Sequence, residues 1–164
     1  MITVRAIRES DIVGFHLAVD TVCRERKYLA TFEAHGLERT RDFVISNITN
    51  GYPQFVSEDE GQVIGWCDAI PGPANSGSAH VGQLGMGILK SHRGRGIGRR
   101  LLEATIQGVR ELGLKKIELS VYARNINAIR LYQKLGFEDE GLKKNGRFAD
   151  GAYDDVRLMA LHLA

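Results

Sequence analysis

Cysteines, long apolar runs and an excess of charge of one sign are all scarce in this chain of 164 residues. Its two cysteines, Cys23 and Cys67, belong to no Cys-x-x-Cys or Cys/His cluster, so we expect no metal site, no disulfide framework and a reducing, cytoplasmic setting. No apolar run approaches the ~20 residues that span a bilayer, and Met1–Ile7 does not resemble a signal peptide. The net charge of +2 gives no general reason to expect a nucleic-acid or membrane partner.

Strand and helix patterns alternate in the first half of the chain. Apolar residues alternate in Ile2–Ile7, as in a strand, and recur at helical spacing from Ile12 to Val22, with Ser10 as a candidate N-cap. A hairpin is expected next, with strands at Gln54–Ser57 and Gln62–Ile70 around a turn at Glu58–Gly61. A loop at Pro71–Ser78 and a strand at His80–Leu89 follow.

Glycines close the other predicted helices. These helices and their closing glycines are Leu37–Ile48 with Gly51, Ile97–Leu112 with Gly113, and Ile126–Leu135 with Gly136. In the first of them, Phe43, Val44 and Ile48 are expected to face the core, and Leu112 is expected on the apolar stripe of the second.

The last strands are expected at Lys116–Tyr122, from Phe137 to Gly141, and at Tyr153–Leu163, where the final two form a hairpin. The order β-α-α-β-β-β-α-β-α-β-β predicts a single α/β domain over residues 1–164, with helices flanking a mixed sheet.

The segment His92–Arg99 reads HRGRGIGR, follows a predicted strand and opens a helix. N–H groups at a helix N-terminus lack intrahelical partners, and the helix dipole favours anions there. Glycines let the backbone approach a phosphate closely, and the arginines at 93, 95, 99 and 100 add positive charge and forked donors. The pattern therefore predicts a diphosphate-binding loop.

Known nucleotide loops fit this segment poorly. A Walker A loop needs Gly-Lys-Ser/Thr, which is absent, and the Rossmann fingerprint is GxGxxG, whereas this loop reads GxGxG. Glu118 lies 20 residues beyond Gly98, within a strand rather than at its tip, where the ribose-binding acid is expected. NAD binding and a plain basic surface turn stay open as alternatives.

Two stretches carry a family resemblance. Arg93-x-x-Gly96-x-Gly98 resembles the (Gln/Arg)-x-x-Gly-x-(Gly/Ala) signature of the GNAT superfamily of N-acetyltransferases, and Asn125–Phe137 resembles that family's N-x-x-A-x-x-x-Y-x-x-x-G-F helix. The resemblance implies a GNAT-like fold with a mostly antiparallel sheet, acetyl-CoA as co-substrate and no metal. The C-terminal pattern from Glu140 to Met159 is similar to that of members acting on amino acids, polyamines or protein N-termini, although Asp150-Gly151 is also typical of a hairpin turn.

The resemblance also implies roles for individual residues. The strand before the loop offers backbone groups to the pantetheine arm, the loop N–H groups bind the pyrophosphate, Asn125 binds the arm and Tyr132 protonates the departing thiolate. The implied cofactor-binding residues are Met86, Gly87, Ile88, Arg93, Gly94, Arg95, Gly96, Ile97, Gly98, Arg99, Asn125 and Tyr132. The alternatives are a core aromatic for Tyr132 and a helix N-cap for Asn125. A phenol with a pKa of ~10 can protonate a thiolate whose thiol has a pKa of ~8.5.

A general base is harder to place. Many family members carry a carboxylate on the strand before the loop or a Glu on the next strand, but this chain has none over His80–Ile88 and has Ser120 at the second position. The remaining candidates are His80, Glu118 and Asp68, acting directly or through water. His80 is the predicted catalytic partner of Tyr132, with a hydrogen-bonded strand histidine as the alternative.

The leading interpretation is an enzyme that moves an acetyl group from acetyl-CoA to a primary amine of a small molecule or peptide. A non-catalytic acyl-CoA-binding module is the alternative, and a nucleic-acid binder using Arg93–Arg100 is disfavoured by the near-neutral charge. Substrate-pocket residues are expected from Arg24–Gly36 and from a loop at Lys143–Gly151. Family resemblance suggests a homodimer.

Overall fold

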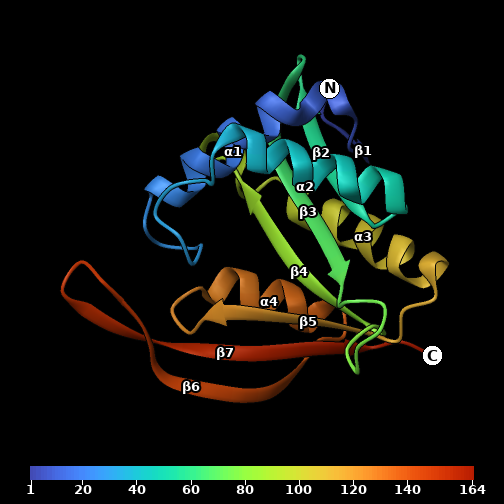
Figure 1. The fold of residues 1–164 in the computed structure, drawn as a ribbon. Helices are drawn as coiled ribbons and strands as arrows, with labels where there is room; N and C mark the ends of the chain where they lie inside the picture. The colour runs from blue at the N-terminus through green and yellow to red at the C-terminus, as the bar shows by residue number, and fades with distance from the viewer.

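Seven strands form a single mixed sheet in the computed structural model, which describes residues 1–164 (Figure 1). Their order across the sheet is β1-β2-β3-β4-β5-β7-β6. The strands are β1 (Thr3–Ala6), β2 (Gln54–Asp59), β3 (Gln62–Pro71), β4 (Val81–Ile88), β5 (Lys116–Tyr122), β6 (Glu138–Ala149) and β7 (Ala152–His162). Every neighbouring pair is antiparallel except β4 and β5, which confirms the predicted α/β fold and its mostly antiparallel sheet.

Four α-helices cover the two faces of this sheet (Figure 1). They are α1 (Ile12–Arg24), α2 (Leu37–Asn50), α3 (Ile97–Leu112) and α4 (Ile126–Lys134), and two short 3-10 helices lie at Glu9–Asp11 and Lys90–His92. One apolar core joins α1 and α2 to β2 and β3, and a larger one joins α3 and α4 to the strands from β3 to β7. None of these helices is both long and apolar enough to cross a bilayer.

Four side-chain predictions at the helices were wrong. Ser10 lies inside the 3-10 helix and is not an N-cap. The side chain that binds the backbone there is Asp11, whose carboxylate accepts a hydrogen bond from the Arg8 N–H at 2.8 Å. Phe43 and Ile48 are 39% and 41% exposed. The buried stripe of α2 instead runs through Thr40, Val44 and Asn47. Two of these residues, Thr40 and Asn47, are polar, so a pattern based on apolar residues overlooks them. Leu112, in the last turn of α3, is also exposed.

The C-terminal hairpin is longer than the sequence indicates. Asp150 and Gly151 both have positive φ (53° and 79°), and Ala149 pairs with Ala152, so these two residues form the tight turn that their sequence suggested. Residues 143–149 belong to β6, so the prediction of a loop at Lys143–Gly151 was wrong. The hairpin tip instead contacts the segment after α1, where Arg26 binds Asp150 at 2.9 Å.

The parallel pair of strands opens a gap in the sheet. β4 and β5 pair only from Val81–Gln83 to Lys116–Glu118, although β4 continues to Ile88 and β5 to Tyr122. Beyond Gln83, one edge of β4 therefore has no strand beside it. The loop that leads to α3 follows directly from this free part of β4.

We expect Gly87→Ala to lower the free energy of unfolding by about 1–3 kcal/mol. A Cβ at position 87 would lie 2.3 Å from Cη2 of Trp66, whose buried ring packs edge-on against Phe15 with 6.0 Å between ring centroids. The ring cannot move without disturbing that pair. Gly77→Ala is the matched control, because nothing lies within 4 Å of its added Cβ. Urea unfolding of both variants checks this, and equal midpoints would contradict it.

Candidate functional site

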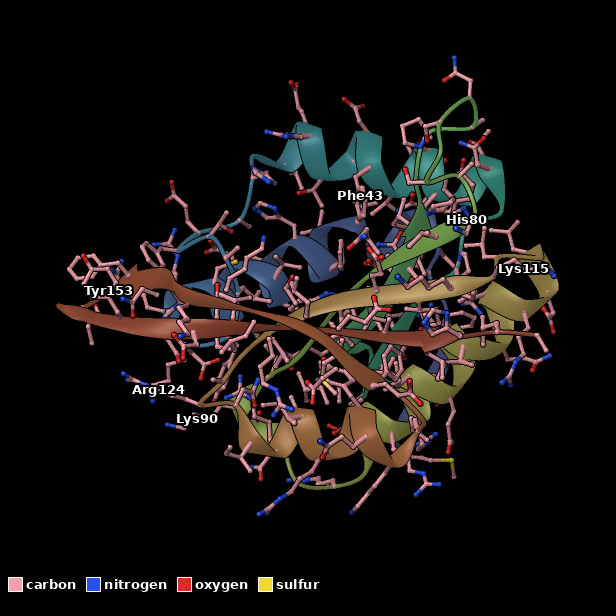
Figure 2. All side chains as sticks on the ribbon, turned by 90° about the horizontal axis from the view of Figure 1, so that it is seen from below. Phe43, His80, Lys90, Lys115, Arg124 and Tyr153 are labelled. Atoms are coloured by element: carbon pink, nitrogen blue, oxygen red, sulfur yellow. The ribbon has the colours of Figure 1, made fainter.

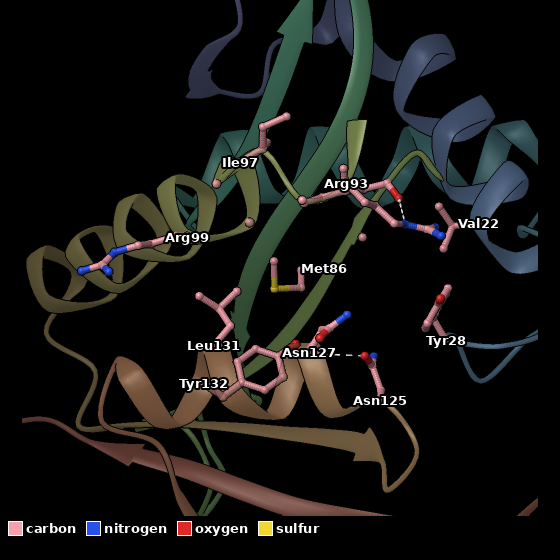
Figure 3. Close-up of a pocket in the computed structure, with 16 residues that line it drawn as sticks. Val22, Tyr28, Met86, Arg93, Ile97, Arg99, Asn125, Asn127, Leu131 and Tyr132 are labelled. Carbon is pink, nitrogen blue, oxygen red and sulfur yellow. Dashed lines mark hydrogen bonds between the residues drawn. The ribbon is translucent and has the colours of Figure 1, made fainter. Parts of the chain in front are cut away.

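A cavity of about 500 Å³ lies where β4 leaves β5 and where α3 and α4 begin (Figure 3). Its sixteen lining residues are Val22, Tyr28, Met86, Gly87, Ile88, Arg93, Gly94, Gly96, Ile97, Gly98, Arg99, Asn125, Asn127, Ala128, Leu131 and Tyr132. The structure thus brings together every residue predicted to bind the cofactor except Arg95. It adds no acidic residue and no histidine.

The glycine-rich loop that lines this cavity has a row of backbone donors without partners in the chain. The N–H groups of Gly94 to Arg99 donate to no group of the chain, and the first N–H of the region to find an acceptor is that of Arg100, bound to Gly96 O at 3.3 Å. Gly94 and Gly96 have φ of 75° and 77°, which lets the chain turn its N–H groups in one direction. No side chain caps α3. The arrangement is suited to an anion with several oxygens.

Arg93 is engaged in the protein rather than free for a ligand. Its guanidinium forms a bidentate pair with Glu25, at 2.9 and 2.5 Å, and its Nε donates to the Ile88 carbonyl at 2.9 Å (Figure 3). This pair holds the pKa of the Glu25 carboxyl below its usual value. The Tyr28 ring lies against the same guanidinium, 4.7 Å from its carbon. Arg93 therefore ties the end of α1 to the loop.

The other loop arginines differ in their engagement. Arg99 pairs with Glu103 at 2.8 Å on the exposed side of α3, and Arg100 donates to the Ile2 carbonyl. Arg95 makes no hydrogen bond within the chain and lies outside the cavity lining. Two of the four arginines expected to add charge and forked donors, Arg93 and Arg99, therefore line the cavity, and both are paired with glutamates of the chain.

Tyr132 is a core aromatic that also lines the cavity. Its ring is 7% exposed and packs against Phe137, with 5.6 Å between ring centroids. Its hydroxyl makes no hydrogen bond, yet it is not among the sealed polar atoms without partners, which are Ser57 Oγ and Arg147 Nε. The hydroxyl therefore reaches the open space of the cavity. Burial raises its pKa, so the phenol stays protonated at neutral pH.

Asn125 is the N-cap of α4, where its Oδ1 accepts the backbone N–H of Ala128 at 3.3 Å (Figure 3). Its amide also lines the cavity, so capping and ligand binding are compatible. Ala128, one turn before Tyr132, leaves the cavity open at that point.

The three predicted base candidates lie in different places. His80 sits in an exposed turn before β4, beside Lys115 and at the opposite end of the sheet from Lys90 (Figure 2). It is about 20 Å along the strand from Met86, at ~3.3 Å per residue, so the structure does not bring it to Tyr132. Glu118 is engaged by Lys116 and Gln83, both at 2.8 Å, which lowers its pKa. Asp68 is buried in β3.

Sequence reasoning missed several lining residues. Val22 was placed on the apolar pattern of the first helix, and Leu131 and Asn127 received no role. Tyr28 falls in the Arg24–Gly36 region that was expected to supply a pocket. Only the pairing of Glu25 with Arg93, which connects residues far apart in the chain, places Tyr28 at the cavity. No three His, Cys, Asp or Glu side chains cluster as a metal site would require.

Comparisons with known proteins agree with these features. The acetyltransferase (GNAT) family matches residues 17–137. The L-amino acid N-acetyltransferase AaaT of Escherichia coli is 33% identical over 113 residues, covering 67% of this chain and 68% of that protein. A probable spermine N(1)-acetyltransferase of Bacillus subtilis subsp. natto is 47% identical over 55 residues, a match that spans 33% of this chain and only 36% of that protein.

The fold has close counterparts among solved structures. The yncA protein of Salmonella typhimurium, solved with its cofactor acetyl-CoA, superposes with a TM-score of 0.92 at 21% identity. The superposition covers 100% of this chain and 95% of that protein.

Proposed function

Since this chain belongs to the acetyltransferase (GNAT) family, we propose that residues 1–164 form one domain that moves the acetyl group of acetyl-CoA to a primary amine. The unpartnered N–H groups of the loop Gly94–Arg99, which lines the same cavity as the unpartnered Tyr132 hydroxyl, carry this proposal.

The donor fits the cavity in two parts. The pyrophosphate of acetyl-CoA accepts hydrogen bonds from the loop N–H groups at the positive end of α3. The pantetheine arm lies along Met86–Ile88, where β4 has no strand on one side, and the Asn125 amide binds it from α4. The apolar lining by Ile88, Ile97 and Leu131 suits the methylene groups of that arm.

The reaction follows from this placement. The neutral amine attacks the thioester carbonyl, a C–N bond forms, and the C–S bond breaks as the tetrahedral intermediate collapses. The thiolate leaves and takes a proton from the Tyr132 hydroxyl, which recovers one from the nitrogen of the new amide through the solvent in the cavity. Burial keeps the Tyr132 phenol protonated at neutral pH by raising its pKa, so the hydroxyl has a proton to give.

The acceptor is a primary amine. AaaT is named for L-amino acids and the Bacillus relative for spermine, which supports an amino acid or a polyamine as the acceptor. A protein N-terminus is a third candidate of the same chemistry.

One observation favours a second function, a module that binds acyl-CoA without turning it over. The lining of the cavity has no carboxylate and no histidine to receive the amine's proton. Such a module would keep every donor contact and lose only the chemistry.

Two measurements separate these functions. We expect acetyl-CoA to raise the melting temperature, because a ligand at 100 times its Kd stabilises the folded state by about 2.7 kcal/mol. We also expect thiol release when methylamine, spermidine or an L-amino acid is added. A thermal shift without thiol release across the panel would favour the module, and no shift with acetyl-CoA or CoA would disprove donor binding.

A further inference from the structure

We propose that Asp68 receives the acceptor, binding its ammonium group and taking the proton whose loss makes the amine nucleophilic. This inference rests on the proposed acetyl transfer. It names a residue that could take the amine's proton, because the cavity lining has no carboxylate and no histidine for that role.

The Asp68 carboxylate projects over a bare stretch of β4. Asp68 lies opposite Gly85 in the antiparallel pair of β3 and β4. A Cβ built on Gly85 would meet one atom within 4 Å, namely Oδ1 of Asp68 at 3.3 Å. The space above Gly85 is thus open, apart from this oxygen.

The two carboxylate oxygens of Asp68 have different surroundings. Oδ2 accepts a hydrogen bond from Gln54 Nε2 at 3.4 Å, and Gln54 Oε1 accepts one from Asn47 Nδ2 at 3.0 Å. This buried polar chain fixes the orientation of the carboxylate. Oδ1 has no partner in the chain, although the residue is only 7% exposed, and it is not sealed from solvent like Ser57 Oγ. A buried carboxylate oxygen without a donor is costly, so a cationic donor fits there.

Asp68 and Tyr132 lie on opposite faces of the sheet. Successive strand residues point to opposite faces, and Met86 packs into the core of α3 and α4 that includes Tyr132. Gly85, and Asp68 opposite it, therefore face the α1 and α2 side. Gly85 and Met86 are neighbours along β4, ~3.3 Å apart in rise, in the part of β4 that no longer pairs with β5. An amine at Asp68 would approach a thioester at Met86 from one face, with Tyr132 on the other.

The environment suits proton transfer at neutral pH. Burial raises the pKa of Asp68 to about 7, and no charged group acts on it. The residues that face it are neutral: Gln54 on β2, Gly85 on β4 and Asn47 on α2, while α1 buries apolar side chains against β3. His16 of α1 is bound to Thr40.

Protons balance along this route. The ammonium gives one proton to Asp68, directly or through one water, and the neutral amine attacks. The second proton reaches the thiolate by way of Tyr132, and Asp68 then releases its proton to solvent. Glu118 is less suited, because Lys116 and Gln83 hold its carboxylate in the charged form and lower its pKa.

The test compares Asp68→Asn, Asp68→Glu and Glu118→Gln in the full chain. We expect Asp68→Asn to reduce kcat/KM for spermidine or for the best L-amino acid about 100-fold at pH 7. We expect it to keep the acetyl-CoA thermal shift, and Asp68→Glu to recover part of the activity. In the native enzyme kcat/KM should rise with pH through about 7, as Asp68 ionises, and this limb should vanish in Asp68→Asn.

Several results would overturn the inference. The first is an Asp68→Asn variant that keeps kcat/KM within threefold or keeps the limb near pH 7, and the second is a larger loss of activity in Glu118→Gln than in Asp68→Asn. If the native enzyme turned over no amine, the proposed function would fail separately. The ¹³C carboxyl resonance of Asp68, assigned with Asp68→Asn, then decides: no shift on adding spermidine or methylamine to the acetyl-CoA complex rejects Asp68 as the amine site, and a shift supports it.

Discussion

Tyr132→Phe is expected to lower kcat about 1,000-fold, which lies within the range for the loss of a general acid. The hydroxyl makes no hydrogen bond within the chain, whereas the ring packs in the core against Phe137. Phenylalanine keeps that packing, so the free energy of unfolding should change by less than ~0.5 kcal/mol. Thiol release at saturating acetyl-CoA, with urea unfolding of the same sample, measures both quantities.

Tyr52→Phe is the control for this prediction. Tyr52 follows α2 and does not line the cavity, so the same loss of a hydroxyl should leave kcat unchanged. If Tyr132→Phe kept kcat within threefold, Tyr132 would be a core aromatic alone. If KM for acetyl-CoA rose while kcat held, the hydroxyl would bind the donor without giving it a proton.

Gly98→Val is expected to weaken acetyl-CoA binding about 1,000-fold. A Cβ on Gly98 would lie 3.3 Å from Ile88 Cδ1, 3.4 Å from Leu131 Cδ2 and 3.6 Å from Met86 Cε, so a branched side chain would fill the cavity beside the free N–H groups. Losing three hydrogen bonds to a charged ligand, at ~1.5 kcal/mol each, corresponds to this factor. Calorimetric titration with acetyl-CoA measures it.

Gln107→Val places the same side chain on the exposed face of the same helix and should leave binding intact. Both variants should fold, because the groups that meet the new side chain at 98 are the ends of flexible side chains. Undiminished binding by Gly98→Val would move the donor out of this cavity.

Local patterns were sufficient to predict the order and type of the elements. Helix-closing glycines, including Gly51 and Gly113 with left-handed φ, marked the ends correctly because that conformation is costly for other residues. The failures at Phe43 and Ile48 have one cause. The buried face of α2 is set by polar contacts, such as Asn47 with Gln54, that hydrophobic periodicity does not record.

At the site, the sequence predicted the arrangement of residues that are neighbours in the chain, and it did not predict pairing between residues far apart in the chain. The unpartnered N–H groups of the glycine-rich loop could be predicted from the loop's own sequence. The engagement of Arg93 by Glu25 and the position of Asp68 opposite Gly85 arise from helix packing and strand register. His80 was expected near the site because it belongs to the same predicted strand as Met86. The two residues lie near opposite ends of β4, so the length of the strand separates them.

The position of β7 between β5 and β6 has a consequence for synthesis on the ribosome. Residues 152–162 are made after both strands that they separate, so β5 can find no antiparallel neighbour until the nascent chain has extended past residue 162. Until then Ile117, Leu119 and Val121 lack Met159, their partner from β7 in the core. The half of the molecule that carries α4 and Tyr132 is therefore the last to fold during translation.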